Sequence, residues 1–204
     1  EKARFSLNKI TAIFLAVIFA FVAFLGIVPT NALAAANKNL LINGDFEQGL
    51  EKWDNGESAF VIDENIFHSG TKSLKTSGIN PVSVIRYRYI DVKPNTDYVL
   101  SAYVKKTSET VSGWIDANLD EASDAPEYQA GSIRSSNDAV SDWEYISLKF
   151  NTKEAEKINI RCIGEGINET SSAWFDDLTL MEADPADIPV TGENLVKNGS
   201  FEEA

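Results

Sequence analysis

Aromatic and planar polar side chains share one side of two segments in the middle of the chain. In the segment 114–119, residue-by-residue alternation places Trp114, Asp116 and Asn118 opposite an apolar side. The same alternation in the segment 98–105 places Tyr103 on the polar side. Surfaces that bind sugar rings combine aromatic platforms for the apolar C–H faces with planar polar groups for the hydroxyls. These four side chains are therefore candidates for stacking on a sugar ring and for hydrogen bonding to it.

Further residues of the same chemical types extend this set. Arg161 joins it because alternation in the segment 158–162 leaves this residue opposite the apolar side. A loop before the segment 129–134 is expected to line the rim of the surface. The alternative is that the aromatic members pack beneath a loop as a minor core, since large rings are often buried. The candidate sugar-binding residues are Tyr103, Trp114, Asp116, Asn118, Tyr128, Gln129, Arg134 and Arg161.

Short segments with strand-like alternation are expected to position these side chains. Period-two alternation between turn signals is typical of half-buried antiparallel strands. No segment after residue 37 has the 3.6-residue period of a helix. The sequence therefore predicts an all-β chain, folded as a jelly-roll β-sandwich of two antiparallel sheets. The expected strands are 82–92, 98–105, 114–119, 144–150, 158–162 and 173–181.

The first 36 residues have the pattern of an export signal. Lys2, Arg4 and Lys9 precede an uncharged apolar run of 19 residues, which Pro29 and an alanine-rich stretch follow. A basic start, an apolar run and small residues at a cleavage site are typical of a signal peptide. A run of this length is also long enough for an uncleaved membrane anchor. In either case the rest of the chain is expected to be secreted or extracellular, with attachment to the cell surface possible.

A motif near the start of the following region recurs near the end of the chain. Both copies read N-L-x-x-N-G-x-F-E, at residues 39–47 and 194–202, an offset of 155 residues. Solenoid repeats are much shorter, so this period indicates tandem whole domains. We therefore expect a signal segment at 1–36, a β-sandwich domain at 37–182, a linker at 183–193 and the truncated start of a second, similar domain at 194–204.

Charge and cysteine content limit the partners of the region after the signal segment. The first 36 residues hold three of the 18 basic and one of the 31 acidic residues, so the remainder has a net charge of −15. Nucleic acids and anionic membranes bind basic surfaces, so neither is expected as a partner. Cys162 is the only cysteine, which excludes a disulfide within the chain. Stability must then come from the core or from a bound metal ion.

The sequence has few residues suited to catalysis. His68 is the single histidine and lies in a turn-like stretch, and the acidic residues of the segment 120–127 are typical of a solvated loop. The sequence contains no nucleophile elbow, phosphate-binding loop or cysteine–histidine metal motif. We therefore expect a module that is not an enzyme. A small hydrolase that uses two carboxylates is the least favoured alternative.

Five motifs follow one another in order between residues 37 and 182. They are N-L-x-x-N-G-x-F-E-x-G at the start, H-S-G-x-x-S-L from His68, Y-x-L-S-A-Y-V-K from Tyr98, D-W at Asp142 before a strand ending F-N-T, and W-F-D-D-L from Trp174. This set resembles carbohydrate-binding modules of the family 4/9 and family 22 type, which are galactose-binding-like jelly rolls. The resemblance implies a glycan site on the concave face or at the loop tips. It also implies structural, core positions for Trp143 and Trp174, and Trp53 is expected in the core with them.

The resemblance further implies a structural calcium ion. Glu47 and Asp176 would supply carboxylates, and the turn near Gly70 to Lys72 would supply backbone oxygens. Alternation puts Asp176 on the same side of its strand as Leu178, which favours Asp176 over its neighbour. The alternative is a solvated acidic pair at the end of a strand.

These expectations together favour non-catalytic carbohydrate binding. The domain would be a monomeric module that targets a secreted multidomain protein, such as a glycoside hydrolase, to a polysaccharide or oligosaccharide. The alternative from another class is a structural or adhesive β-sandwich of a cell-surface protein, without a sugar site.

Overall fold

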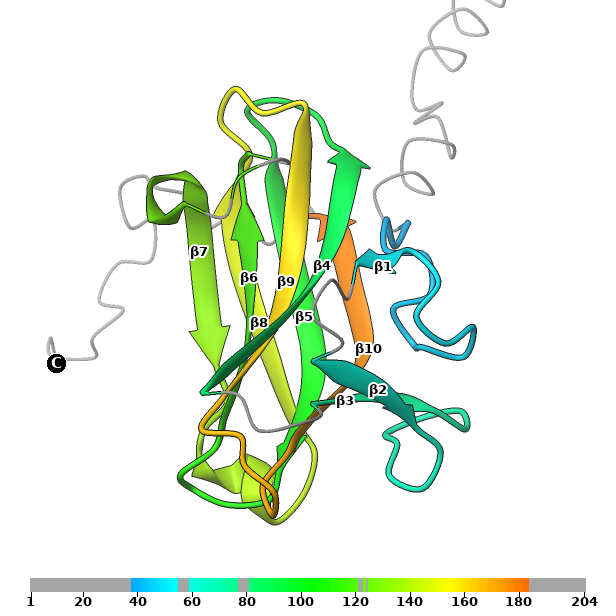
Figure 1. Cartoon of the computed structure of the whole chain (residues 1–204). Helices are drawn as coiled ribbons and strands as arrows, with labels where there is room; N and C mark the ends of the chain where they lie inside the picture. The colour runs from blue at the N-terminus through cyan, green and yellow to red at the C-terminus, as the bar shows by residue number, and fades with distance from the viewer. Residues whose placement is uncertain (1–37, 55–58, 77–80, 121–122, 124, 184–204) are drawn as a thin grey trace, which may run out of the picture. The chain divides into compact units, whose positions relative to one another are not determined.

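The computed structural model describes residues 38–54, 59–76, 81–120, 123 and 125–183, which form two antiparallel sheets of five strands each (Figure 1). Sheet A has the strand order β1-β4-β9-β6-β7, and sheet B has the order β2-β3-β10-β5-β8. The strands of sheet A are Trp53–Asp54 (β1), Val82–Asp91 (β4), Ser112–Asn118 (β6), Gln129–Arg134 (β7) and Lys157–Glu165 (β9). The strands of sheet B are Phe60–Asp63 (β2), Ser73–Thr76 (β3), Asp97–Lys106 (β5), Glu144–Asn151 (β8) and Ala173–Glu182 (β10). The short 3-10 helices Pro126–Tyr128 (η1) and Asn137–Val140 (η2) precede β7 and β8.

This architecture confirms the predicted all-β sandwich. The six strands expected from alternation are β4, β5, β6, β8, β9 and β10, and their bounds differ from the expected ones by a few residues at most. The structure adds β1, β2, β3 and β7, which are short or carry weak alternation. The consecutive strands β5 and β6 belong to different sheets. Figure 1 shows β5 behind β4 and β9, in the second layer.

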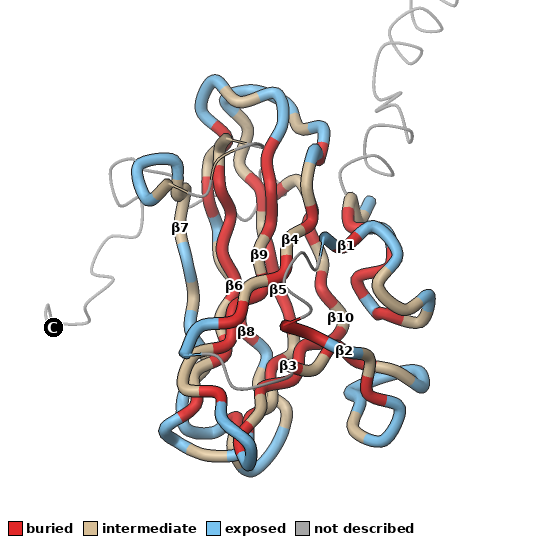
Figure 2. The backbone as a smooth tube through the Cα atoms, viewed as in Figure 1, coloured by how far each residue is buried: buried red, intermediate tan, exposed pale blue. Residues whose placement is uncertain are grey.

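The hydrophobic core lies between the two sheets. Leu100, Ala102 and Val104 of β5 are fully buried, as are Ile158 and Ile160 of β9. Figure 2 shows that most positions along these two strands are buried. Each sheet therefore buries one face against the other and leaves a second face on the outside of the sandwich.

Glycines let the two sheets approach closely. A Cβ atom on Gly113 would lie 2.6 Å from Val104 Cγ1, and one on Gly164 would lie 2.5 Å from Thr76 Cγ2. Both separations are shorter than ordinary van der Waals contacts, so larger residues there would push the sheets apart. Because Gly113 faces the core, its neighbour Trp114 projects from the outer face of sheet A.

Cys162 lies in this core and is fully buried. Burial, with the nearby charge of Asp116, raises the pKa of its thiol well above the ordinary value. A thiol that stays protonated and buried is a packing group, not a nucleophile.

The segment before β1 docks on β10 through backbone hydrogen bonds. Leu40 N donates to Leu180 O at 2.8 Å, and Leu178 N donates to Gly44 O at 2.9 Å. A Cβ atom on Gly44 would lie within 2.2 Å of Leu178 O, so the close approach requires glycine at this point. The N-L-x-x-N-G motif therefore joins the two ends of the domain.

The tryptophans expected in the core do not all lie there. Trp53 and Trp174 are buried, at 6% and 5% exposure, and Trp53 packs edge-on against Tyr87. Trp143 is only partly buried and contacts His68 on the outside of sheet B, so its predicted core position is wrong. It lies just before β8, ahead of Ile146, the first buried position of that strand.

Among the described residues, no helix is long and apolar enough to cross a membrane. The predicted signal segment and second repeat lie outside the described residues, as does the predicted linker after Ala183.

Candidate functional site

Most of the predicted sugar-binding residues lie together on the outer face of sheet A. Cross-strand pairing places Arg161 of β9 beside Asp116 of β6, and Arg134 of β7 beside Trp114 of β6. Asn118 is likewise paired with Gln129. We call the outward side chains of β4, β6, β7 and β9 the sheet A face. Six predicted residues belong to it: Trp114, Asp116, Asn118, Gln129, Arg134 and Arg161.

A buried ion pair lies on the two inner strands of the sheet A face. Arg161 Nε donates to Asp116 Oδ1 at 2.7 Å, and Arg161 Nη2 donates to Asp116 Oδ2 at 2.6 Å. Gln129 Nε2 donates to the same carboxylate at 2.9 Å. The Asp116 side chain is fully buried and that of Arg161 is 11% exposed. A two-point pair of this kind fixes both planar groups in direction, so the hydrogen-bonding pattern is preformed.

The Trp114 ring stands next to this pair, beneath an arginine. The Arg134 guanidinium lies 3.5 Å from the ring centroid, which is a cation–π stack. Arg134 Nη1 also donates to Glu165 Oε2 at 2.6 Å. Trp114 Nε1 is buried and has no hydrogen-bond partner within the part of the chain that the structure describes. Because Arg134 is 45% exposed, the stack is accessible to a ligand from its arginine side.

Two asparagines hold the loop that follows β6. Asn118 and Asn159 face each other on β6 and β9, and both are fully buried. Asn159 Nδ2 donates to Asp120 O at 2.8 Å, and Asp120 N donates to Asn118 Oδ1 at 3.1 Å. In the described ranges Asn118 Nδ2 and Asn159 Oδ1 have no partner. Each unpaired buried polar atom costs about 1–3 kcal/mol, a cost that a ligand hydroxyl or a water molecule would remove.

Exposed tyrosines occur at two positions around the sheet A face. Tyr128 ends η1, just before β7, and is 42% exposed. Tyr89 lies on β4 and is 60% exposed. Tyr89 could not be recognised from the sequence pattern, because simple alternation from Tyr87 would turn it toward the core.

A bulge in β4 is what exposes Tyr89. The pairing with β9 shifts between Tyr87 and Ile90, both of which face the core. Tyr89 has a φ of 60° there, a left-handed conformation that is costly for a bulky residue. Bulges often redirect a side chain beside a functional site. The strained backbone therefore presents an aromatic ring on the outside of sheet A.

Tyr103 does not belong to the sheet A face. It lies on β5 of sheet B and projects from the opposite side of the sandwich, so the expectation that it shares one face with Trp114 is wrong. Alternation predicts the side of a strand correctly for both residues, but it does not say which sheet each strand joins. The Tyr103 ring stacks on His68, with ring centroids 3.5 Å apart.

The predicted calcium ligands surround the turn of residues 68–72. The Glu47 carboxylate accepts hydrogen bonds from Thr71 N at 2.7 Å, Thr71 Oγ1 at 2.7 Å and Lys72 N at 2.8 Å. These bonds, chiefly those from Thr71, lower the pKa of Glu47. Lys72 Nζ donates to the backbone oxygen of Glu47 at 3.3 Å. Glu47 therefore holds the end of this turn that leads into β3.

Asp176 holds the other end of the turn. Its Oδ2 accepts from His68 N at 2.8 Å and from Ser69 N at 3.2 Å. The side chain is fully buried, and burial raises its pKa to about 6. The charge of Asp177 acts in the same direction, while the N–H donors oppose it. In the described region, no cationic side chain pairs with the Asp176 carboxylate.

The chemistry of this corner suits a hard cation only in part. Calcium takes carboxylate and backbone oxygens together, and Asp176 is a buried carboxylate with no cationic partner among the described residues. Among the described residues, however, no group of three or more His, Cys, Asp or Glu side chains could hold a metal ion. Backbone oxygens, such as that of Lys72, would have to complete a shell around Glu47 and Asp176.

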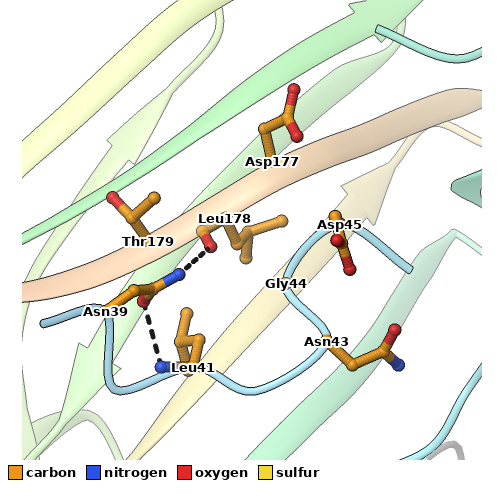
Figure 3. A pocket seen from close by; sticks show the side chains of 8 residues that line it. All are labelled: Asn39, Leu41, Asn43, Gly44, Asp45, Asp177, Leu178 and Thr179. Atoms are coloured by element: carbon orange, nitrogen blue, oxygen red, sulfur yellow. Dashed lines mark hydrogen bonds between the residues drawn. The ribbon is translucent and has the colours of Figure 1, made fainter. Parts of the chain in front are cut away.

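A polar pocket of about 260 Å³ lies beside this corner, between the N-terminal segment and β10 (Figure 3). Asp45 and Asp177 both line it. Asn39 spans the pocket wall, since its Nδ2 donates to Leu178 O at 3.2 Å and its Oδ1 accepts from Leu41 N at 3.0 Å. The pocket is small, and its polar groups hold the N-terminal segment on β10. We therefore attribute these polar groups to docking of the N-terminal motif.

The two packed antiparallel sheets make this domain a β-sandwich of the jelly-roll class. The chain belongs to the CBM_4_9 family of carbohydrate binding domains, whose family model matches residues 38–164. This family binds carbohydrate without catalysing a reaction on it.

Several solved structures with the same fold are described as carbohydrate-binding modules. One is described as family 16 carbohydrate binding module-2, with a TM-score of 0.55 and 24% identity over 71% of this chain and 100% of that one. TmCBM61 in complex with beta-1,4-galactotriose has a TM-score of 0.55 and 16% identity over 72% and 100%. The CBM22-1 xylan-binding domain of Xyn10C from Paenibacillus barcinonensis has a TM-score of 0.53 and 15% identity over 72% and 96%. A search of curated proteins found no match.

Proposed function

We propose that the sheet A face binds a neutral polysaccharide chain. The observation that carries this proposal is the combination of the preformed Asp116–Arg161 pair, the Trp114 stack and the unpaired buried atoms of Asn118 and Asn159 on one face. A sheet that merely met water would need neither buried ion pairs nor unpaired amides on its outer side. Pyranose rings supply hydroxyl groups that can bond to the unpaired amide atoms. They also supply apolar C–H faces that can pack on the aromatic stack.

Charge on the sheet A face favours a neutral ligand over an acidic one. All four arginines after residue 36 lie on β4, β7 or β9, yet most of them are neutralised locally. An arginine that already holds a carboxylate offers its remaining N–H groups to hydroxyls more readily than to a second anion. The carboxylate pairs are Arg161 with Asp116, Arg134 with Glu165 and Arg88 with Asp54.

We extend the proposal to the whole protein: the module is exported and tethers a larger protein, such as a glycoside hydrolase, to polysaccharide. The basic and apolar pattern of residues 2–28 supports export. The repeated N-L-x-x-N-G-x-F-E motif supports tandem modules, and linking modules raises apparent affinity without new contacts. In one solved structure of the same fold, a CBM22-1 module is joined to a GH10 module. That structure is of the xylanase Xyn10B from Clostridium thermocellum, complexed with xylohexaose.

Replacing Tyr89 with glycine tests the sheet A face directly. Glycine adopts a positive φ without strain, so the free energy of unfolding should stay within about 1 kcal/mol of the wild-type value. Loss of the exposed ring should weaken glycan binding about fivefold. The measurement is affinity electrophoresis of both proteins in gels that contain soluble β-glucan, xylan, mannan or galactan, with urea unfolding as the measure of stability.

The Tyr89→Ala variant distinguishes the effect of losing the ring from the effect of relieving the backbone strain. It should bind as weakly as the glycine variant and be the less stable of the two, because alanine keeps the strained conformation. If no gel retards the wild-type protein, the sandwich is a structural or adhesive unit instead. Equal retardation of wild type and both variants would place the ligand elsewhere on the module.

We also propose that a calcium ion binds at the corner formed by Glu47, Asp176 and the backbone of Lys72. A ligand that binds only the folded state stabilises it, by about 2.7 kcal/mol at one hundred times its dissociation constant. Calcium should then raise the melting temperature by about 5–10 °C relative to the protein in EDTA. Differential scanning calorimetry with calcium, magnesium or EDTA measures this shift.

Glu47→Gln is the control for the calcium prediction. Its amide oxygen can still accept the hydrogen bonds of Thr71 N and Lys72 N, which share one oxygen of Glu47, but it lacks the charge that a cation requires. The variant should melt at the same temperature with calcium and with EDTA. If the wild-type protein also melts alike in both, hydrogen bonds alone hold the turn and the calcium proposal fails.

A further inference from the structure

A cluster of aromatic rings lies on the outer face of sheet B, the side of the sandwich opposite the sheet A face. His68 stacks on Tyr103 with ring centroids 3.5 Å apart, and it meets the edge of Trp143 at 5.8 Å. Tyr145 contacts Tyr103 at 5.3 Å, and the two are cross-strand partners on β8 and β5. We call these four residues the sheet B cluster.

The sheet B cluster is held rigidly. His68 N donates to Asp176 Oδ2 at 2.8 Å, and His68 Nδ1 lies 2.6 Å from Asp177 Oδ2. These contacts fix the imidazole from the backbone side and from its edge, while Tyr103 supports its face. Rings that are already ordered lose little conformational entropy when a ligand binds, which is a property of good binding surfaces.

One ring of the cluster is not needed for packing of the core. Tyr145 is 55% exposed, and it lies between Glu144 and the buried Ile146, which faces the core from the same strand. The ring of Tyr103 already stacks on His68 and so anchors the loop that carries His68. Tyr145 is therefore not needed to hold that loop. An exposed ring on a rigid aromatic base is the geometry that stacks on the C–H face of a sugar.

Polar groups around the sheet B cluster favour an uncharged occupant. His68 bonds to Asp177, and Lys105 and Glu144 contribute one charge of each sign, so both signs of charge lie beside the hydrogen-bonding groups of this surface. A charged peptide would need an uncompensated partner, whereas a polyol would not. The bonds that hold these groups are His68 Nδ1 with Asp177 Oδ2, Lys105 Nζ with Ser141 O, and Ser136 N with Glu144 Oε2.

We propose that the sheet B cluster is a second glycan-binding surface, with Tyr145 as its stacking platform. The inference rests on the proposed function of the sheet A face, since it takes the same class of neutral polysaccharide. Two surfaces on opposite sides of one module bind two glycan chains at once. The module then cross-links polysaccharide as well as attaching to it.

The test compares wild type, Trp114→Ala, Tyr145→Ala and the double variant in affinity gels that contain a soluble polysaccharide retarding the wild type. Tyr145→Ala should weaken retardation about fivefold. Trp114→Ala should retain a weak residual retardation, which the double variant loses. Light scattering of wild type mixed with polysaccharide should show cross-linked particles that both single variants abolish. Val61→Ala, another exposed apolar truncation in sheet B, should behave as wild type throughout.

Each other outcome has a defined meaning. If Tyr145→Ala binds and cross-links as wild type does, the second surface is overturned while the sheet A proposal stands. If Trp114→Ala and Tyr89→Gly change nothing but Tyr145→Ala abolishes retardation, the sheet A proposal fails and the sheet B cluster is the glycan site. If wild type sediments as a dimer that Tyr145→Ala dissociates, the occupant is a second copy of the chain, and the glycan proposal for this cluster is wrong.

Discussion

Truncation of Asp116 to alanine is expected to lower the free energy of unfolding by about 3–5 kcal/mol. The substitution leaves the Arg161 guanidinium in its place, only 11% exposed, without the carboxylate that binds two of its nitrogens. Gln129 also loses the oxygen to which its amide donates. Urea unfolding followed by tryptophan fluorescence measures the loss, and glycan affinity should fall with it because the face is no longer ordered.

The double variant Asp116→Ala, Arg161→Met is the control for this prediction. An apolar side chain removes the buried charge that has lost the Asp116 carboxylate, so the double variant should be more stable than Asp116→Ala alone. Such non-additivity is the signature of a direct interaction between the two residues. A loss below about 1 kcal/mol for the single variant, the value typical of exposed pairs, would show that this ion pair is hydrated and not buried.

Trp114→Ala is expected to have the largest effect on glycan binding, a decrease in affinity of about thirtyfold or more. The indole is the largest side chain of the sheet A face, and its removal also leaves Arg134 without the ring on which it stacks. Arg134 keeps its bond to Glu165, so its position becomes less defined without being lost. Isothermal titration with a soluble polysaccharide that retards the wild type would provide the affinity.

Trp114→Phe distinguishes stacking from hydrogen bonding. Phenylalanine keeps an aromatic face but lacks Nε1, which is buried and unpartnered in the described structure. If stacking dominates, the variant should keep most of the affinity. If the indole N–H donates to a ligand hydroxyl, Trp114→Phe should bind nearly as poorly as Trp114→Ala. Wild-type affinity in Trp114→Ala itself would contradict the assignment of this face.

The site could be predicted from sequence to the extent that it depends on one strand at a time. Alternation placed Trp114, Asp116 and Asn118 together because they are two residues apart on one strand. The Asp116–Arg161 pair could not be derived, since the residues are 45 positions apart and meet only through the register of β6 with β9. Register depends on long-range hydrogen bonds that a local pattern does not contain.

Tyr89 and Tyr103 show two different ways in which local pattern is insufficient. A bulge in β4 turns Tyr89 outward against its alternation, and a bulge arises from pairing with the neighbouring strand. Tyr103 has the outward direction that alternation predicts, but β5 pairs with β8 and β10 and not with β6. The residue therefore contributes to the opposite side of the sandwich.

By itself, the sequence determined the all-β class, the inward side of β5, β6, β8 and β9, and the types of side chain available for binding sugar. These properties follow from the two-residue period of a strand and from the chemistry of single residues. Only the tertiary structure decided which strands share a sheet, which side chains meet across it, and how Glu47 and Asp176 hold the turn of residues 68–72. Those contacts join segments far apart in the chain, and only the packing of two complete sheets brings them together.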